Sequence, residues 1–251
     1  MTQCCFLCYD SLMRVVSFVP SWTETLIEAQ IEVVGRTRFC IHPEDTVKAI
    51  SVVGGTKNIN LDQVIALKPD LVIFDKEENN QEMYQLCVEQ GLNCYATHVI
   101  DLKSCGEELL SLAKLLNNEL LKTWGSEYLS FSTVPTTQFK KCIIEGEFET
   151  TANYTYVIWK KPFMRVSPNT FIADVLRLFD INLADSEIKY PEIADEDLKK
   201  TFCIFSSEPF PFAKYMSELK TQGYKGVLID GEKISWYGIR TLKFLKSLEL
   251  S

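Results

Sequence analysis

The fold is decided by the stretch Leu67-Lys68-Pro69-Asp70-Leu71-Val72-Ile73-Phe74-Asp75-Lys76-Glu77. It aligns without a gap on a second stretch 131 positions later, Leu198-Lys199-Lys200-Thr201-Phe202-Cys203-Ile204-Phe205-Ser206-Ser207-Glu208. Each copy contains the end of a polar helix, an apolar run too short for a helix, and a polar loop with a glutamate. Such a run between turn signals is typical of a buried parallel strand. Similar units also recur by chance in α/β proteins, but a matched pair predicts two similar α/β lobes.

The glutamates of these two stretches are expected at functional edges. Ligands of open α/β sheets bind beyond the carboxyl ends of the strands, so Glu77 and Glu208 would each lie at such an edge. Three uses stay open: an acid/base or hard-cation site, a docking rim for arginines of a symmetric partner, or plain solvated carboxylates. The first use draws on Glu77, Glu78, Glu208, Asp230 and Glu232.

The composition bounds the class of protein. The 251 residues suffice for one large domain or for two lobes, and 46% hydrophobic with 24% charged residues is ordinary for a globular protein. A net charge of −8 without a basic stripe argues against nucleic acid and against an anionic membrane surface. No apolar run approaches the length of about 18 residues that a membrane span needs.

The cysteines and the first residues bear on the compartment. Nine cysteines without a regular framework indicate a reducing environment. No basic residue precedes Arg14, and residues 1–12 lack the long apolar segment of a secretory signal, so we expect a loose N-terminal extension there. The sequence as given therefore predicts a cytoplasmic protein, or a periplasmic one if the gene model is truncated upstream.

The order of elements predicts the domains. A β-rich run at Arg14–Val19 leads into a helix with the capping box Ser21-x-x-Glu24, and strands then alternate with helices up to about residue 100. Leucines recur at helical spacing within 101–133, which predicts one long connecting helix or two abutting ones, with a break possible at Asn117-Asn118. An unbroken helix of about 25 residues would span roughly 37 Å. The second lobe is expected at 134–251, and the structure of 132–153 is left open.

The loops after the predicted strands carry aromatic rather than catalytic residues. Three of the four tryptophans lie there, where an amphipathic ring can cover a flat ligand or simply pack. The chain has only two histidines, His42 and His98, and it lacks H-x-x-x-H, G-x-S-x-G and paired Cys-x-x-Cys motifs. The segment Gly54-Gly55-Thr56-Lys57 does not have the spacing of a phosphate loop, so a nucleotide site is disfavoured.

Seven motifs carry a resemblance to a known family. They are RVVSFVPSWTETL (14–26), VVGRTRFCIHP (33–43), VGGTKNINLDQVIALKPDLVIFDKEEN (53–79), VIWKKPFM (157–164), NTFIADVLRLFDIN (169–182), SSEPFPF (206–212) and DGEKISWYGIR (230–240). Together they resemble the class III, helical-backbone substrate-binding proteins of ABC importers, which include vitamin B12-binding and ferric-siderophore-binding proteins. The resemblance covers essentially all of 13–249.

The resemblance implies an α/β fold of two Rossmann-like lobes joined by a long helix, with a ligand in the cleft between them and no catalysis. It implies cobalamin or a similar metal chelate as ligand, an ABC permease as partner, a monomer, and no required cofactor or protein metal site. The implied ligand-binding residues are Ser21, Trp22, His42, Gly55, Thr56, Lys57, Glu77, Trp159, Glu208, Trp236, Tyr237 and Arg240. The chain departs from the family in lacking an export signal and in its short segment 122–153.

Two rival hypotheses remain beside the binding protein. One is an α/β enzyme that uses Glu77, Glu208 and His42 around a metal or a sugar-like substrate. The other is an interaction module whose tryptophans pack on one another. Aromatic loops suit many flat or bulky chelates, so haem and siderophores stand beside cobalamin as candidate ligands.

Overall fold

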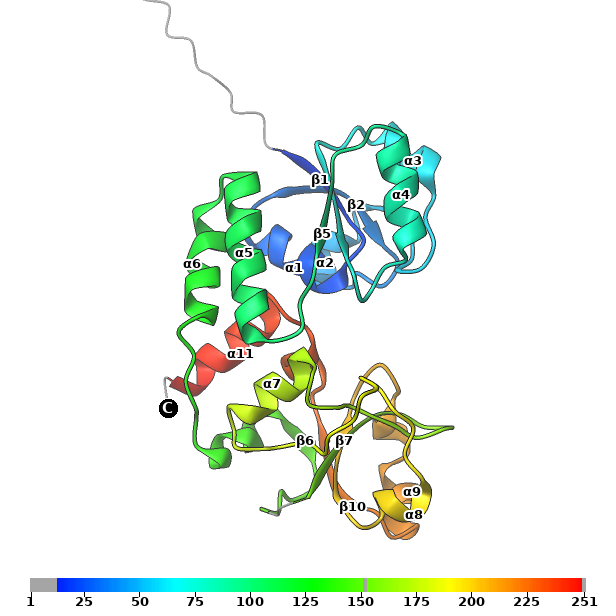
Figure 1. Ribbon diagram of the computed structural model, residues 1–251, viewed down its shortest axis with the longest axis vertical. Helices are drawn as coiled ribbons and strands as arrows, with labels where there is room; N and C mark the ends of the chain where they lie inside the picture. The colour runs from blue at the N-terminus through cyan, green and yellow to red at the C-terminus, as the bar shows by residue number, and fades with distance from the viewer. Residues whose placement is uncertain (1–12, 151–152, 250–251) are drawn as a thin grey trace, which may run out of the picture. The chain divides into compact units, whose positions relative to one another are not determined.

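The computed structural model describes residues 13–150 and 153–249, which form two compact units divided between Thr97 and His98 (Figure 1). Each unit has its own five-stranded sheet. The predicted α/β fold of two lobes is therefore confirmed. The expected N-terminal extension, 1–12, lies outside the described residues. None of the helices in the described ranges has the length and hydropathy that crossing a membrane requires.

Unit 1 is built on a sheet in which every pairing is parallel, with strand order β3-β2-β1-β4-β5. Its strands are β1 (Arg14–Ser17), β2 (Glu32–Thr37), β3 (Ser51–Gly54), β4 (Leu71–Asp75) and β5 (Cys94–Thr97). Its helices are α1 (Pro20–Glu28), α2 (Glu44–Val47), α3 (Leu61–Ala66) and α4 (Gln81–Glu89). Because all five strands run the same way, the loops that follow them gather at one edge of the sheet.

Strand β4 lies at the centre of the unit 1 core, as its continuous apolar run predicts. All five of its residues are buried. The ring of Phe74 stacks on Phe18 with centroids 5.0 Å apart, and Val72 and Met83 belong to the same cluster. Each fully buried side chain of this size contributes about 1.5–3 kcal/mol to folding. This core fixes the sheet edge on which the loops stand.

The predicted capping box at Ser21 does not form. Helix α1 begins at Pro20, one residue earlier, and its N-cap Val19 makes no side-chain capping bond. Proline lacks an N–H and has a helical φ, so it is favourable in the first turn and Ser21 falls inside the helix. The hydroxyl of Thr23 donates instead to the Val19 carbonyl at 2.9 Å.

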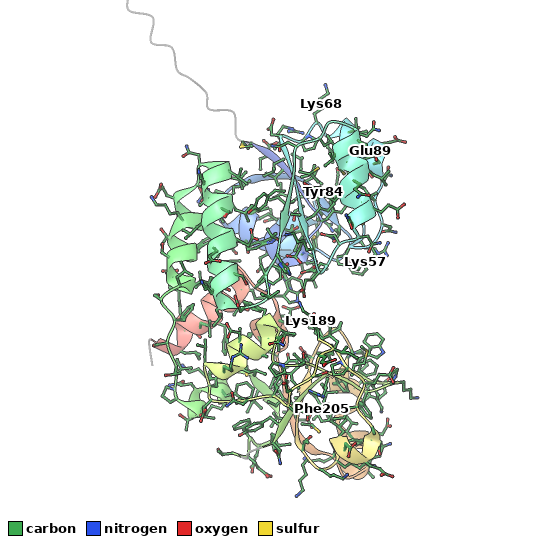
Figure 2. The ribbon with its side chains drawn as sticks, in the orientation of Figure 1. Lys57, Lys68, Tyr84, Glu89, Lys189 and Phe205 are labelled. Carbon is green, nitrogen blue, oxygen red and sulfur yellow. The ribbon has the colours of Figure 1, made fainter. Side chains whose placement is uncertain are left out.

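Unit 2 has a mixed sheet with strand order β6-β10-β9-β7-β8, in which β7, β9 and β10 are parallel. Its strands are β6 (Ile143–Glu145), β7 (Tyr154–Trp159), β8 (Met164–Arg165), β9 (Phe202–Ser206) and β10 (Lys225–Ile229). Its helices are α5 (Leu102–Leu116), α6 (Glu119–Tyr128), α7 (Phe171–Arg177), α8 (Asp195–Leu198), α9 (Met216–Thr221), α10 (Glu232–Ser235) and α11 (Ile239–Glu249), with 3-10 helices η1 (Thr136–Cys142) and η2 (Phe212–Lys214). Strand β9 is buried throughout, like β4, and Figure 2 labels its Phe205.

The segment 101–133 forms two helices, so the unbroken helix of about 37 Å does not exist and the two-helix alternative holds. Asn117 ends α5 in the left-handed conformation at φ 48°, and the Asn118 side chain caps α6 by accepting from the Leu121 N–H at 3.0 Å. Gly106 and Gly125 let the two helices pack closely, because a Cβ on either would lie 2.9 Å from the other's carbonyl oxygen. Both helices belong to unit 2, which begins at His98 rather than near residue 134.

Candidate functional site

At the carboxyl edge of the unit 1 sheet, Asn79 joins three loops. Its side-chain carbonyl accepts from the backbone N–H of Asp75 at 2.8 Å, and its amide donates to the carbonyls of Phe18 at 3.2 Å and Thr56 at 2.9 Å. Phe18 and Thr56 follow β1 and β3, and Asp75 is the last residue of β4. A buried amide with all these bonds fixes the loops relative to one another.

The carboxylate of Asp75 closes its own loop. Oδ1 accepts from the N–H groups of Glu77 at 2.9 Å and Glu78 at 3.3 Å, while Oδ2 accepts from the Thr97 hydroxyl at 2.8 Å. The Trp22 indole donates to the same Thr97 oxygen at 2.8 Å. Asp75 is only 2% exposed, so its charge is stabilised by the fold and is not offered to solvent.

Two residues of unit 1 that the sequence placed against a ligand are packing residues in the structure. Trp22 is fully buried, at 0% exposed, and Ser21 is buried beside it in α1. The first turn of α1 packs onto the unit 1 core directly after β1, so the Trp22 ring fills the interior. In this structure the Trp22 ring presents no exposed surface to a ligand.

The other predicted residues of unit 1 lie in the edge loops. Lys57 is exposed and its Nζ donates to the Glu77 carbonyl at 3.3 Å, which brings the loops after β3 and β4 together (Figure 2). Thr56 and Glu77 are half-buried, and Gly55 is buried with its N–H bonded to Asn58 Oδ1 at 2.7 Å. His42 is half-buried in the loop after β2 and precedes the cis-proline Pro43.

At the carboxyl edge of the unit 2 sheet, Glu208 and Trp236 meet. The Ser235 hydroxyl donates to Glu208 Oε1 at 2.6 Å, and the Trp236 side chain makes a second hydrogen bond to this carboxyl. On the same ring, the Arg240 guanidinium lies 5.4 Å from the Trp236 ring centroid and pairs with Glu232 at 2.8 Å. Three of the predicted residues, Glu208, Trp236 and Arg240, therefore form one cluster.

The environment of Glu208 changes its acidity. Burial raises the pKa of this carboxyl above its ordinary value of 4.5, although the hydrogen bonds from Ser235 and Trp236 act in the opposite direction. The negative charges of Glu232 and Asp230 raise it further. Glu208 is therefore a carboxyl turned toward its own unit and half shielded from water.

Two further predicted residues of unit 2, Trp159 and Tyr237, differ in their exposure. Trp159 ends β7 and is 41% exposed, and its ring meets Phe210 edge to face at 5.5 Å. Tyr237 is only 7% exposed and packs against Phe171 with centroids 5.8 Å apart. Tyr237, just before α11, therefore presents little surface to a ligand in this structure.

Several residues with positioning roles were missed by the sequence analysis, namely Asp75, Asn79, Thr97, Phe210 and Ser235. Asn79 and Phe210 lie in loops within the family motifs, so their position in these loops could have identified them from the sequence. Within 13–150 and 153–249, no three histidines, cysteines or acidic residues are grouped to hold a metal ion.

The unit 2 carboxylates that we considered for a cation site each have their own ion-pair or hydrogen-bond partners. Glu232 pairs with Arg240, and Asp230 pairs with Lys233 at 3.3 Å. Glu208 takes hydrogen bonds from Ser235 and Trp236. Such pairing fixes loops and leaves these oxygens poorly disposed to share one cation.

Known proteins resemble the chain in sequence and in fold. The vitamin B12-binding protein of Salmonella typhi is 27% identical over 100 residues, which make up 40% of this chain and 37% of that protein. The matched region thus spans little more than a third of the relative's length. The periplasmic vitamin B12 binding protein BtuF of Vibrio cholerae has the same fold, with a TM-score of 0.69 at 16% identity over 94% of both chains.

A second solved structure extends the likeness in fold. A periplasmic heme binding protein from Pseudomonas aeruginosa gives a TM-score of 0.72 at 16% identity, covering 94% of this chain and 91% of that one. Residues 15–201, well over half of the 251, match the family model described as periplasmic binding protein. The chain therefore belongs to the periplasmic binding protein family.

Proposed function

We propose that this chain is a non-catalytic ligand-binding protein, the substrate-binding component of an ABC-type importer or a cytoplasmic relative of one. Its proposed ligand is cobalamin or a similar metal chelate. Family membership and the likeness to a vitamin B12-binding protein support the class. The observation that carries the ligand proposal is the aromatic carboxyl edge of unit 2, formed by Trp159, Phe210 and Trp236.

The aromatic edge is suited to a large flat ligand. Trp159 is exposed, while Phe210 and Trp236 are half-buried, so parts of three rings face solvent on loops that a rigid sheet positions. Rings with two side-chain torsions lose little entropy on binding and contribute large apolar contact areas. The faces of a corrin or porphyrin macrocycle match this chemistry.

The polar groups around Trp236 supply directional contacts. Arg240, which lies over the ring, forms an ion pair with Glu232, and Glu208 takes hydrogen bonds from Ser235 and from the Trp236 side chain. A mostly apolar site with a few fixed polar groups is the usual composition of a small-molecule site. Amide or carboxylate substituents at the margin of a macrocycle would find partners here.

Unit 1 is proposed to contribute polar loop contacts. Thr56, Lys57 and Glu77 stand in two loops tied together by Asn79 and by the Lys57–Glu77 hydrogen bond. Their backbone is fixed before any ligand arrives, which lowers the entropic cost of binding. The rival enzyme that uses Glu77, Glu208 and His42 receives no support from the relatives, which are binding proteins by name.

We further propose that the protein works in a reducing compartment, in keeping with its cysteine content. The six cysteines of the described residues are all free, and burial raises the pKa of Cys40, Cys105, Cys142 and Cys203. Alkylation of the chain in intact native cells, followed by mass analysis, should find these thiols unpaired. Disulfides trapped among them would contradict this proposal.

The ligand proposal is tested by absorbance titration of the purified chain with cyanocobalamin and, separately, with hemin. Binding with a dissociation constant below about 50 µM is expected for one of the two. Trp159→Ala combined with Trp236→Ala should weaken it roughly 30- to 100-fold, because each ring contributes about 1–1.5 kcal/mol. Trp124→Phe, in α6 and away from the loops, is the control and should bind like the parent. Absence of binding by both chelates would contradict the proposal.

A further inference from the structure

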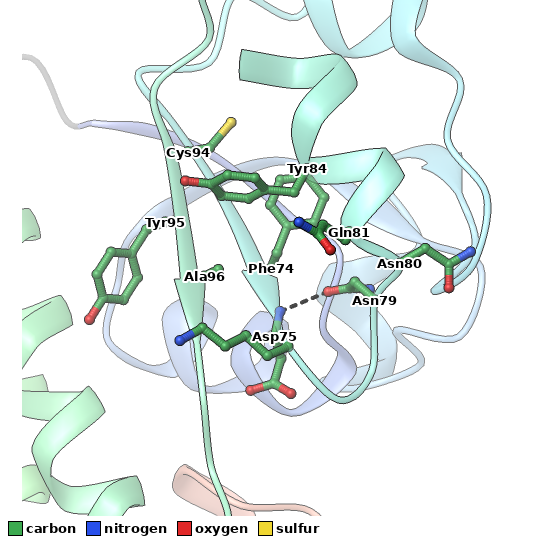
Figure 3. A pocket seen from close by; sticks show the side chains of 10 residues that line it. Phe74, Asp75, Asn79, Asn80, Gln81, Tyr84, Cys94, Tyr95 and Ala96 are labelled. Atoms are coloured by element: carbon green, nitrogen blue, oxygen red, sulfur yellow. Dashed lines mark hydrogen bonds between the residues drawn. The ribbon is translucent and has the colours of Figure 1, made fainter. Parts of the chain in front are cut away.

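Unit 1 contains a cavity of about 650 Å³ that the proposed function does not use. It lies on the α4 side of the β4–β5 edge and is lined by Phe74, Asp75, Lys76, Asn79, Asn80, Gln81, Tyr84, Cys94, Tyr95 and Ala96 (Figure 3). None of the twelve residues that the sequence assigned to the ligand is among them. Its volume falls within the range of about 300–1,000 Å³ that small-molecule sites occupy.

The floor of the cavity is aromatic and apolar. The rings of Phe74 and Tyr84 meet edge to face with centroids 5.6 Å apart. Cys94 and Ala96 alternate with Tyr95 along β5, so they share the face that looks toward Tyr84 while Tyr95 points to the other side (Figure 3). Because β5 is the last strand of the sheet, no further strand lies beside it at this edge. A flat apolar ring fits such a floor.

The polar groups at the rim have unused hydrogen-bonding capacity. Among the described residues, the Lys76 ammonium makes no ion pair, and neither the Gln81 amide nor the Tyr84 hydroxyl has a hydrogen-bond partner. All three are donors. The one carboxylate in the lining, Asp75, already accepts hydrogen bonds from Glu77, Glu78 and Thr97. The rim therefore offers hydrogen-bond donors, among them an ammonium group that is in no ion pair with a described residue.

From this arrangement we propose that the cavity is a second ligand site, for a small aromatic carboxylate. The ring lies on the half-buried side chains of Tyr84 and Ala96, and the carboxylate accepts from the exposed Lys76. The Gln81 amide and the Tyr84 hydroxyl are the additional donors. Charge-assisted hydrogen bonds of a lysine to a carboxylate are stronger than those to a neutral oxygen, which gives the site its preference for an anion.

The test is calorimetric titration of the full chain with a matched series of probes: 1-naphthoate, neutral 1-naphthalenemethanol and cationic 1-naphthylmethylammonium. The anion should bind with a dissociation constant of about 0.1–1 mM, as expected for a ligand of this size, and the neutral and cationic probes at least about fivefold more weakly. Equal affinity across the series would overturn the proposal, as would no measurable binding of 1-naphthoate.

Two variants test separately the contribution of the Lys76 charge and that of the apolar floor of the cavity. Lys76→Gln, at an exposed position, should reduce 1-naphthoate affinity to that of the neutral probe, while Lys114→Gln, an exposed lysine of α5, should change nothing. Ala96→Phe should fill the floor and exclude all three probes. If Lys76→Gln and Lys114→Gln bind alike, the site is refuted.

A competition experiment separates this site from the proposed function. Bound 1-naphthoate should persist when cyanocobalamin is added, and its displacement would overturn the claim of a separate site. The naphthoate titrations test the second site even if no metal chelate binds, because the cavity contains none of the residues proposed to contact the chelate.

Discussion

The loop after β4 in unit 1 and the loop after β9 in unit 2 follow aligned strands, Leu71–Asp75 and Phe202–Ser206. At the last strand position one unit has Asp75 and the other has Ser206. Asp75 accepts two N–H groups of its own loop and the Thr97 hydroxyl. Ser206 instead takes a hydrogen bond from the Tyr156 hydroxyl at 3.2 Å. The first loop therefore closes on itself.

The second loop closes on its neighbour. The N–H of Gly231, after β10, donates to Ser207 Oγ at 3.0 Å, and Ser235 donates to Glu208. A Cβ at Gly231 would lie 2.0 Å from Ser206 Oγ, so only glycine permits this approach of the two loops. This difference separates a loop closed by its own strand-end carboxylate from a loop held by the segment after β10. It leaves unit 1 with a pre-satisfied polar edge and unit 2 with an aromatic one.

The largest expected loss of stability comes from exchanging the residue at the end of the strand. Ser206→Asp would bury a carboxylate at a position that is 1% exposed, where Tyr156 is the one hydroxyl donor among the described residues and where Glu208 and Asp230 add negative charge around Tyr156. We expect the free energy of unfolding of unit 2 to fall by at least about 3 kcal/mol in chemical denaturation. Ser207→Asp, at the half-buried next position, is the control and should lose at most about 1 kcal/mol. Equal losses would show that the strand-end position is not special.

Removing the amide that ties the unit 1 loops gives the next largest effect. Asn79→Ala leaves the Asp75 N–H and the Phe18 and Thr56 carbonyls without their partner. Unit 1 should lose about 2–3 kcal/mol of unfolding free energy, because buried groups left unpaired are costly. The exposed neighbour Asn80 makes one bond, to the Lys57 carbonyl at 3.2 Å, and Asn80→Ala should cost about 0.5 kcal/mol or less. A similar cost for both variants would argue against the three-loop role of Asn79.

The smallest effect depends on pH and concerns Glu208. A carboxyl with a raised pKa binds its proton more tightly in the folded state, so its contribution to stability falls as pH rises from 4.5 through the raised value. Glu208→Gln does not titrate. The unfolding free energy of the variant minus that of the parent should therefore increase with pH across this window and stay constant above it. A difference that decreases with pH would mean that the folded pKa is lowered.

The buried strands could be predicted from the sequence, but the hydrogen bonds between loops could not. Apolar runs such as Leu71–Phe74 and Phe202–Phe205 can only be buried, so sequence alone places them in the core. Glu208 and Ser235 are 27 residues apart, and they meet only because β9 and β10 are neighbours in the sheet, an order that no local pattern encodes. The same holds for Trp22 and Thr97, 75 residues apart.

The tryptophans show most clearly that sequence alone does not predict which loop side chains are exposed. Trp22 comes shortly after β1 and Trp159 ends β7, yet the first is fully buried and the second is 41% exposed. The first lies in a helix that turns back onto the core, and the second ends the strand at the start of a polar turn. Loop composition therefore identified the right edge of each sheet but not which rings remain open at it.

We propose that the aromatic edge of unit 2 makes the main contacts with a metal chelate. It is tested most directly by titrating the chelate bound by the parent chain against two double variants, Trp159→Ala with Trp236→Ala in unit 2, and Lys57→Ala with Glu77→Gln in unit 1. The unit 2 pair should weaken binding roughly 30- to 100-fold and the unit 1 pair about 10-fold or less, because ring contacts contribute more than exposed polar ones. A unit 2 pair that binds like the parent would contradict the claim.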